Sequence, residues 1–124
     1  NACVIWPGFY CYVDGNLQRF AVNIRIEEVT GRQVEFEMGE AAPAGVSEGC
    51  RYWNIELEEV IPAGSAVSAE PGTGFTLKLI TDEKTEELSG CVWQTTSRVY
   101  SKEGLRRIHR GVALSRKEVT DGLS

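Results

Sequence analysis

Apolar and polar residues alternate strictly over several stretches of this chain, and this feature limits its fold more than any other. The pattern runs through residues 20–27, 33–38, 53–58 and 75–79. A period of two places every second side chain on the same face of a strand, whereas a helix needs a period near 3.6. Each stretch is therefore predicted to be a strand with one face on a core. In the first stretch the apolar residues are Phe20, Val22, Ile24 and Ile26.

Two groups of turn residues predict β-hairpins. Asp14-Gly15-Asn16 follows an aromatic strand, and an Asp-Gly pair is typical of the tight turns that join antiparallel strands. Thr30-Gly31-Arg32 predicts a second hairpin, in which residues 20–26 pair with residues 34–38.

The rest of the chain is predicted to contain loops and four or five more strands. Residues 39–49 are rich in Ala, Gly, Pro and Ser and are predicted to be a loop, and Pro62-Ala63-Gly64 is predicted to end a strand. Residues 88–100 are rich in Val, Trp, Thr and Tyr, which favours a long strand. A strand near 107–114 is predicted next, followed by a short helix or a frayed tail.

Length and spacing complete the fold prediction. The chain has 124 residues, of which 42% are hydrophobic, so residues 1–124 are expected to form one β domain with its own core. About seven short strands with frequent turns indicate a small antiparallel β-barrel or sandwich. No apolar run reaches the ~18 residues that a membrane span needs, so none is expected.

The charge is divided unevenly along the chain. Residues 1–97 carry 6 Lys/Arg against 15 Asp/Glu, whereas residues 98–124 carry 7 against 3. An acidic body does not favour nucleic-acid binding, which needs a basic surface to neutralise phosphates. Guanidinium groups bind carboxylates and phosphates in a forked geometry, so arginines are the best ligand-binding candidates. The candidates are Arg106, Arg107 and Arg110, together with Arg19 and Arg25.

Residues that usually carry catalysis are few. His109 is the only histidine, and the arginines around it predict a neutral ring at the surface. No nucleophile elbow, phosphate loop or dinucleotide fingerprint is present. Glu56 and Glu58 share one strand face, which is predicted to be the solvated side of a sheet. We therefore expect a binding protein rather than an enzyme, with no catalytic residues, no metal site and no cofactor.

The cysteines leave two alternatives open. The chain contains Cys3, Cys11, Cys50 and Cys91, and none of them forms a Cys-x-x-Cys pair. Two disulfides are expected if the protein works in the periplasm or outside the cell, whereas four buried thiols are expected in a reducing compartment.

Motifs between residues 54 and 114 suggest a family. In order they are Pro71-Gly72-Thr73-Gly74, Leu88-Ser89-Gly90-Cys91-Val92-Trp93 and Gly111-Val112-Ala113-Leu114, after a strand that ends near Gly64. This series resembles the PilZ domain, a six-stranded bacterial barrel that binds cyclic di-GMP. The resemblance implies a barrel that lies in the cytoplasm.

Departures from the PilZ pattern fall at the ligand-binding motifs. The family's Asp/Asn-x-Ser-x-x-Gly turn falls on Glu59, Ile61 and Gly64, so only the glycine is retained. The Arg-x-x-x-Arg clamp has no counterpart, since Arg19 and Arg25 are six positions apart. The resemblance therefore implies a degenerate adaptor that binds a protein partner. A small anionic ligand is a secondary expectation, and cyclic di-GMP is not expected to bind.

A second resemblance lies in the first half of the chain. Phe9-Tyr10-Cys11 and Ser47-Glu48-Gly49-Cys50-Arg51-Tyr52 resemble the periplasmic inhibitors of C-type lysozymes. Those proteins are disulfide-held β-barrels that insert a Ser-Gly loop into the enzyme. The alternative function is therefore an exported inhibitor or effector that uses Ser47 and Tyr52.

Overall fold

The computed structural model describes residues 8–31, 33–36, 43–47, 51–66 and 73–119. Within these ranges all regular structure is β-strand and none is helix, which confirms the predicted all-β class. The strands are β1 (Phe9–Val13), β2 (Asn16–Leu17), β3 (Ala21–Val29), β4 (Gln33–Phe36), β5 (Pro43–Ser47), β6 (Tyr52–Pro62), β7 (Thr73–Thr81), β8 (Thr85–Ser101), β9 (Gly104–Ala113) and β10 (Ser115–Val119).

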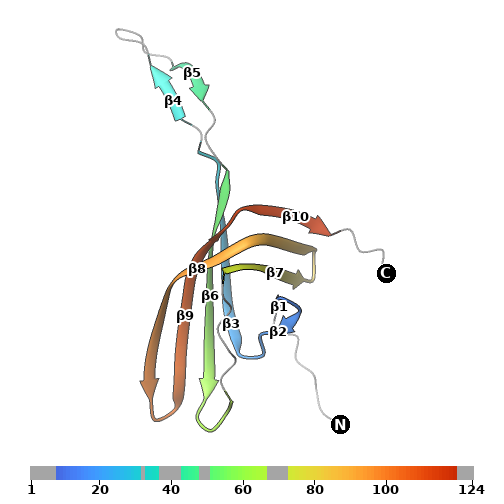
Figure 1. The fold of residues 1–124 in the computed structure, drawn as a ribbon, viewed down its shortest axis with the longest axis vertical. Coiled ribbons are helices and arrows are strands. Elements are labelled where there is room, and N and C mark those ends of the chain that lie inside the picture. The colour runs from blue at the N-terminus through green and yellow to red at the C-terminus, as the bar shows by residue number, and fades with distance from the viewer. Residues whose placement is uncertain (1–7, 32, 37–42, 48–50, 67–72, 120–124) are drawn as a thin grey trace.

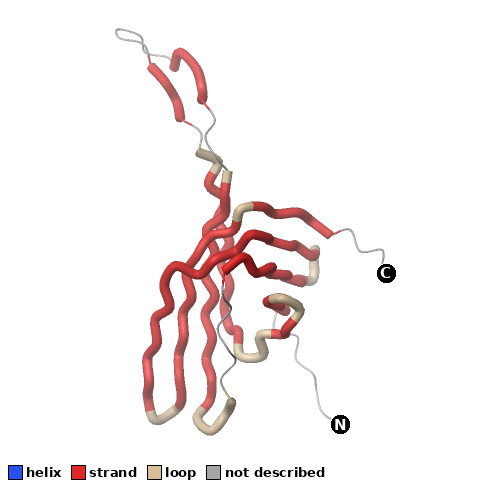
Figure 2. The backbone as a smooth tube through the Cα atoms, viewed as in Figure 1, coloured by secondary structure: helices blue, strands red, loops and turns tan. Residues whose placement is uncertain are grey.

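Eight of these strands form one antiparallel sheet that is bent along β8. The order is β2-β1-β7-β8-β9-β6-β3, and β10 pairs with the first part of β8 (Figure 1). The tube in Figure 2 shows β8 passing from the part of the sheet with β7 and β10 to the part with β9 and β6. Strands β2 and β3 lie at opposite ends of the order, so the sheet is not closed into a barrel.

The bend requires a glycine where β8 and β9 approach closely. Gly111 is paired with Trp93, and the β8 register shifts between Trp93 and Thr95. A Cβ atom built on Gly111 would lie 1.9 Å from the carbonyl oxygen of Val92. Any side chain at this position would therefore displace the backbone of β8.

The core lies between the two parts of the bent sheet. Alternation along β6 buries Trp53, Ile55 and Leu57, as the sequence predicts, and Phe75, Leu77 and Leu79 are buried on β7. Cys11, Val13, Leu88, Cys91 and Ala113 complete the buried cluster. Because five strands contribute to it, the cluster joins both parts of the sheet into one core.

The hairpin predicted at Asp14-Gly15-Asn16 is confirmed, whereas the hairpin predicted at residues 30–32 is wrong. Asp14 and Gly15 have φ values of 50° and 83°, and β1 pairs with β2 across them. β3, however, pairs with β6, and β4 pairs with β5 in a separate two-stranded sheet. Pairing with β6 places Ile24 and Ile26 beside Leu57 and Ile55, which brings both isoleucines against the core.

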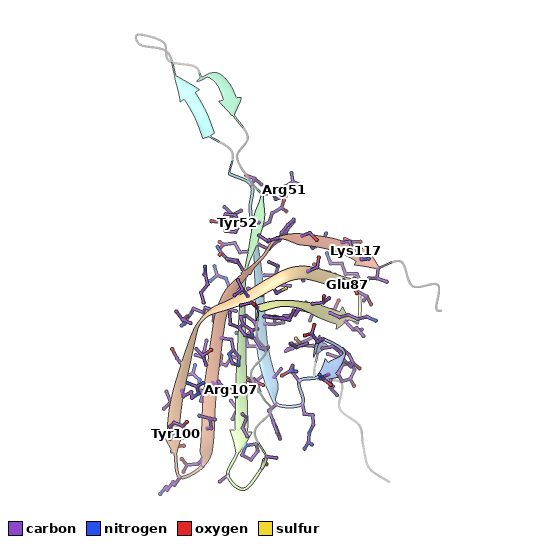
Figure 3. The ribbon with its side chains drawn as sticks, in the orientation of Figure 1. Arg51, Tyr52, Glu87, Tyr100, Arg107 and Lys117 are labelled. Atoms are coloured by element: carbon purple, nitrogen blue, oxygen red, sulfur yellow. The ribbon has the colours of Figure 1, made fainter. Side chains whose placement is uncertain are left out.

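Three smaller predictions are also corrected. The loop predicted at 39–49 contains β5, and its other positions, 39–42 and 48–49, lie outside the described residues. Val22 is 53% exposed because the register between β3 and β6 shifts between Ala21 and Asn23. The predicted helix or frayed tail is β10, whose Lys117 lies opposite Glu87, with the two side chains paired at 3.3 Å (Figure 3).

Candidate functional site

Strands β6 and β9 present two chemically different faces. Glu59 lies in register with Arg107, and Leu57 lies in register with His109, so these four side chains share the face that is directed to the core. The opposite, solvent-directed face is called the outer face below. It consists of Glu56, Glu58 and Val60 on β6, Arg106, Ile108 and Arg110 on β9, and Thr95, Ser97 and Val99 on β8.

Ion pairs cross the outer face. Arg106 Nε lies 2.6 Å from Glu58 Oε2, and Arg110 Nε lies 3.1 Å from Glu56 Oε1. The prediction that these two glutamates lie on the solvated side of a sheet is confirmed. Both arginine side chains are about half exposed, so each pair contributes at most about 1 kcal/mol to stability.

A shallow polar groove of about 390 Å³ lies at one end of the outer face. Arg25, Glu56 and Arg110 form one row across β3, β6 and β9, so two guanidinium groups flank one carboxylate. Arg25 also pairs with Glu27 at 3.6 Å, which balances the charges of the groove. The rest of the lining consists of the uncharged polar residues Asn54, Gln94 and Thr95, together with Ile55 and Gly111.

The inner face holds a buried ionic cluster. Glu59, Arg107 and His109 are only 1%, 3% and 2% exposed. Arg107 donates a hydrogen bond from Nε to Glu59 Oε1 at 2.8 Å, and His109 Nε2 lies 3.0 Å from the same oxygen. Burial raises the pKa of Glu59, but the hydrogen bonds from His109 and Arg107 and their charge outweigh it, so the pKa lies below its usual value.

His109 is enclosed on every side, which corrects the prediction of a surface histidine. Its Nδ1 lies 3.0 Å from Thr96 Oγ1, and the Trp93 ring stacks on the imidazole with 5.1 Å between ring centroids. Threonine, histidine and glutamate thus follow one another in the order of a hydrolase triad. Here, however, the carboxylate oxygen is shared with Arg107 and tryptophan stacks on the imidazole, and these contacts connect β6, β8 and β9.

The five predicted arginines do not form one site. Arg25 and Arg110 meet in the groove, and Arg106 lies further along the outer face. Arg107 is on the opposite face, inside the core side of β9 (Figure 3). Arg19 lies elsewhere, with its guanidinium 4.9 Å from the centre of the Phe20 ring.

The described cysteines are free thiols. Cys11 and Cys91 are both buried and carry no disulfide, whereas Cys3 and Cys50 lie outside the described residues. Burial raises the pKa of Cys11 to about 12, with smaller contributions from Glu59 and Cys91. Burial likewise raises the pKa of Cys91 to about 11. Both thiols are therefore protonated and weakly nucleophilic near neutral pH.

Sequence reasoning missed three members of the buried cluster, namely Glu59, Thr96 and Trp93. A signal for Glu59 was present, because continuing the alternation of Ile55 and Leu57 places residue 59 on the buried face. A charged residue at a core position indicates an ionic partner inside the protein. Thr96 carried no such signal, since the register shift in β8 decides which face it occupies.

The residues that carry the two family resemblances lie partly in described strands and partly outside the described residues. Glu59 and Ile61, at the Asp/Asn and Ser positions of the PilZ turn, are buried within β6. Pro71 and Gly72 of the second motif lie outside the described residues. Ser47 ends β5 and Tyr52 begins β6, while residues 48–50 of the inhibitor-like segment are also outside them.

No protein-family profile matches the chain, and no curated protein is significantly similar to it. Within the described ranges, no helix of membrane-spanning length and hydropathy occurs. The same ranges contain no group of three or more potential metal ligands.

Proposed function

We propose that this chain is a non-catalytic binding module that holds a protein partner on its outer face. The proposal rests on the contrast between the two faces of β6 and β9. Ionisable side chains on the inner face are buried and bonded to one another, whereas the outer face is open to solvent. Val60 and Val99 are 46% and 57% exposed and flank Arg106 in one cross-strand row. Exposed apolar side chains among charged ones are typical of protein-binding surfaces.

The polar groove lies on the same outer face, with the row of Glu58, Ile108 and Ser97 between it and the valine row, and it extends the binding surface. Its arginines and carboxylates are balanced in charge, which suits a polar peptide segment better than a polyphosphate. Asn54, Gln94 and Thr95 add hydrogen-bonding groups that can bind the backbone of such a segment. We therefore assign the groove a role in specificity and the valine row a role in affinity.

A degenerate PilZ-type adaptor is the form of this module that we favour. The burial of Glu59 and Ile61 supports the loss of a dinucleotide site, because neither side chain reaches a ligand in solvent. The free thiols of Cys11 and Cys91 support a reducing compartment. A calorimetric titration of the protein with cyclic di-GMP is expected to give no binding heat. Saturable binding would instead favour a PilZ-type domain that still binds this ligand.

Site-specific photocrosslinking tests the outer face directly. Val99 and Tyr100 are adjacent, strongly exposed and on opposite faces of β8, so a photoreactive residue at 99 has a matched control at 100. In native-host extract, position 99 is expected to give one discrete protein adduct that excess unlabelled wild-type protein competes away. Competitor carrying Arg106→Glu is expected to compete poorly, whereas competitor carrying Arg19→Glu is expected to compete normally. Equal labelling from positions 99 and 100, or no competition, would reject the proposal.

A further inference from the structure

We infer that two copies of this chain associate through the free edge of β3, which extends the sheet across a two-fold axis at Ile26. This inference concerns the edge of β3, whose Arg25 and Glu27 also line the groove of the outer face, and it does not depend on the proposed function. It follows from the position of β3 in the sheet, from its length and from the order of charges along it.

Of the two strands that end the sheet order, β3 is the longer. It stands at one end of the strand order and, among the described strands, pairs only with β6. It contains nine residues, against two in β2 at the other end and five in β10. An edge strand offers a row of backbone N–H and C=O groups that can pair with another strand. Edge-to-edge pairing of strands is a common mode of protein association.

The charges on β3 select a second copy as the occupant. Charged residues usually protect an edge strand from pairing, because like charges then face each other. In an antiparallel pair centred on Ile26, Arg25 of each copy lies opposite Glu27 of the other copy. Two opposite-charge pairs then form on the same face, one on each side of the axis. Such cross-strand pairs stabilise a sheet, whereas like charges directly opposite destabilise it.

Neighbouring registers are less favourable. Centring the pair on Arg25 would place this arginine opposite its own copy, and centring it on Glu27 would do the same for the glutamate. The register centred on Ile26 also brings together two isoleucines that pack against the two cores. Glu28 then falls opposite Ile24, where it keeps its 3.1 Å ion pair with Arg51 of the same chain.

Both charged side chains are available for these pairs. The side chains of Arg25 and Glu27 are 66% and 53% exposed, and the ion pair between them within one chain is long, at 3.6 Å. Exchange of this contact for one between copies needs a change of side-chain rotamer and the loss of the long, 3.5 Å hydrogen bond that Glu27 accepts from Asn54. The pairing would extend the outer faces of the two copies into one surface.

Charge reversal at these two positions tests the register. Sedimentation velocity over a concentration series is expected to show dimers of the wild-type protein. Arg25→Glu and Glu27→Arg are each expected to weaken dimerisation about tenfold or more, since each turns both cross-axis pairs into like charges. The double variant R25E/E27R is expected to dimerise like the wild type. An equimolar mixture of the two single variants is expected to form a heterodimer, because one copy then supplies two acidic groups and the other supplies two basic groups.

Controls separate this interface from general charge effects. Lys102→Glu makes the same change in charge as Arg25→Glu, but in the β8–β9 turn, and this variant is expected to remain dimeric. The unfolding midpoints of the single variants are measured alongside, and they are expected to stay near that of the wild type because both positions are exposed. A wild-type protein that stays monomeric to about millimolar concentration would overturn the inference. Dimers that persist in both single variants, or single variants that fail to associate when mixed, would overturn it as well.

Discussion

Glu59 and Arg107 face each other across β6 and β9, with Oε1 2.8 Å from Nε and side chains that are only 2% and 4% exposed. The two residues are 48 positions apart in the chain, so their contact ties β6 to the β8–β9 hairpin. His109 shares the same carboxylate oxygen and extends the contact to Thr96 on β8. A single buried carboxylate is thus the centre of a polar network that spans three strands.

Removal of this carboxylate charge is expected to be costly. Glu59→Gln keeps the shape of the side chain but removes the buried carboxylate charge that Arg107 and His109 both contact. We expect the free energy of unfolding to fall by about 3–5 kcal/mol, measured by urea denaturation. The matched variant Glu58→Gln removes a carboxylate from a half-exposed pair on the outer face and is expected to cost less than about 1 kcal/mol. Equal losses in the two variants would contradict a structural role for the cluster.

Because of the Glu59 carboxylate, the stability of the folded protein is expected to depend on pH in the acid range. The pKa of Glu59 is lowered in the folded protein from its ordinary value of 4.5, so the folded state releases this proton more readily than the unfolded state does. The resulting stabilisation is complete above about pH 4.5 and is lost as the pH falls through the lower, folded-state value. Unfolding midpoints between pH 7 and pH 3 are expected to fall more steeply for the wild type than for Glu59→Gln. If the midpoints of the wild type and Glu59→Gln fell in parallel with pH, ionisation of Glu59 would not contribute to the loss of stability in acid.

The buried thiols predict a characteristic pattern of alkylation. At pH 8 iodoacetamide is expected to leave Cys11 and Cys91 unmodified in the folded protein, and to modify both after unfolding without reductant. Peptide mass spectrometry distinguishes the two sites. A requirement for reductant would show that these cysteines are paired, contrary to the structure, and would favour the exported-inhibitor alternative.

Alkaline pH provides a second test of the same thiols. Their pKa values are raised from 9.0 to about 12 for Cys11 and about 11 for Cys91, so the unfolded state ionises first. Stability from this source is complete below about pH 9 and is lost as the pH rises through the folded-state values. Cys11→Ala is therefore expected to reduce the fall in stability between pH 9 and pH 11, measured by urea denaturation. If the free energy of unfolding of Cys11→Ala fell with pH as steeply as that of the wild type, Cys11 would not be the source of the alkaline loss of stability.

The close approach of β8 and β9 is expected to make Gly111 intolerant of any side chain. Gly111→Ala places a methyl group against the backbone of Val92, and we expect a loss of about 3 kcal/mol or more in the free energy of unfolding. Gly64→Ala serves as the control. Gly64 has a φ of 86° but no neighbour within 4 Å of a built Cβ, so only the backbone strain of about 1–2 kcal/mol is expected. A Gly111→Ala variant as stable as this control would contradict the packing at the bend.

Strand positions were largely predictable from the sequence because alternation and turn residues are local signals. Ile55 and Leu57 on β6, and Phe75 and Leu77 on β7, occupy the buried face that their spacing predicts. Strand pairing was not predictable in the same way. Residues 20–26 have an apolar face that fits either the next strand in the chain or a distant one, and only the completed core selects β6.

The candidate site was predictable in part. Arg25, Arg106 and Arg110 were identified from arginine chemistry, and two of them meet in one groove. Arg107 is separated from its neighbours because adjacent residues of a strand point to opposite faces. The role of His109 was missed because flanking arginines suggest solvent, whereas the partner that makes burial favourable, Glu59, is 50 positions away.

The long β8–β9 hairpin bears on the order in which the strands of one chain pair during folding. Its pairs run outward from Ser101 and Gly104 at the turn to Val92 and Val112, so it can close progressively from a short loop. β6, by contrast, meets β9 only after a much longer loop closes. We therefore expect the hairpin to form early and β6 to dock on it late. The Arg107 guanidinium is then buried in the same step that brings the Glu59 carboxylate to it, so loss of water and formation of this ion pair coincide.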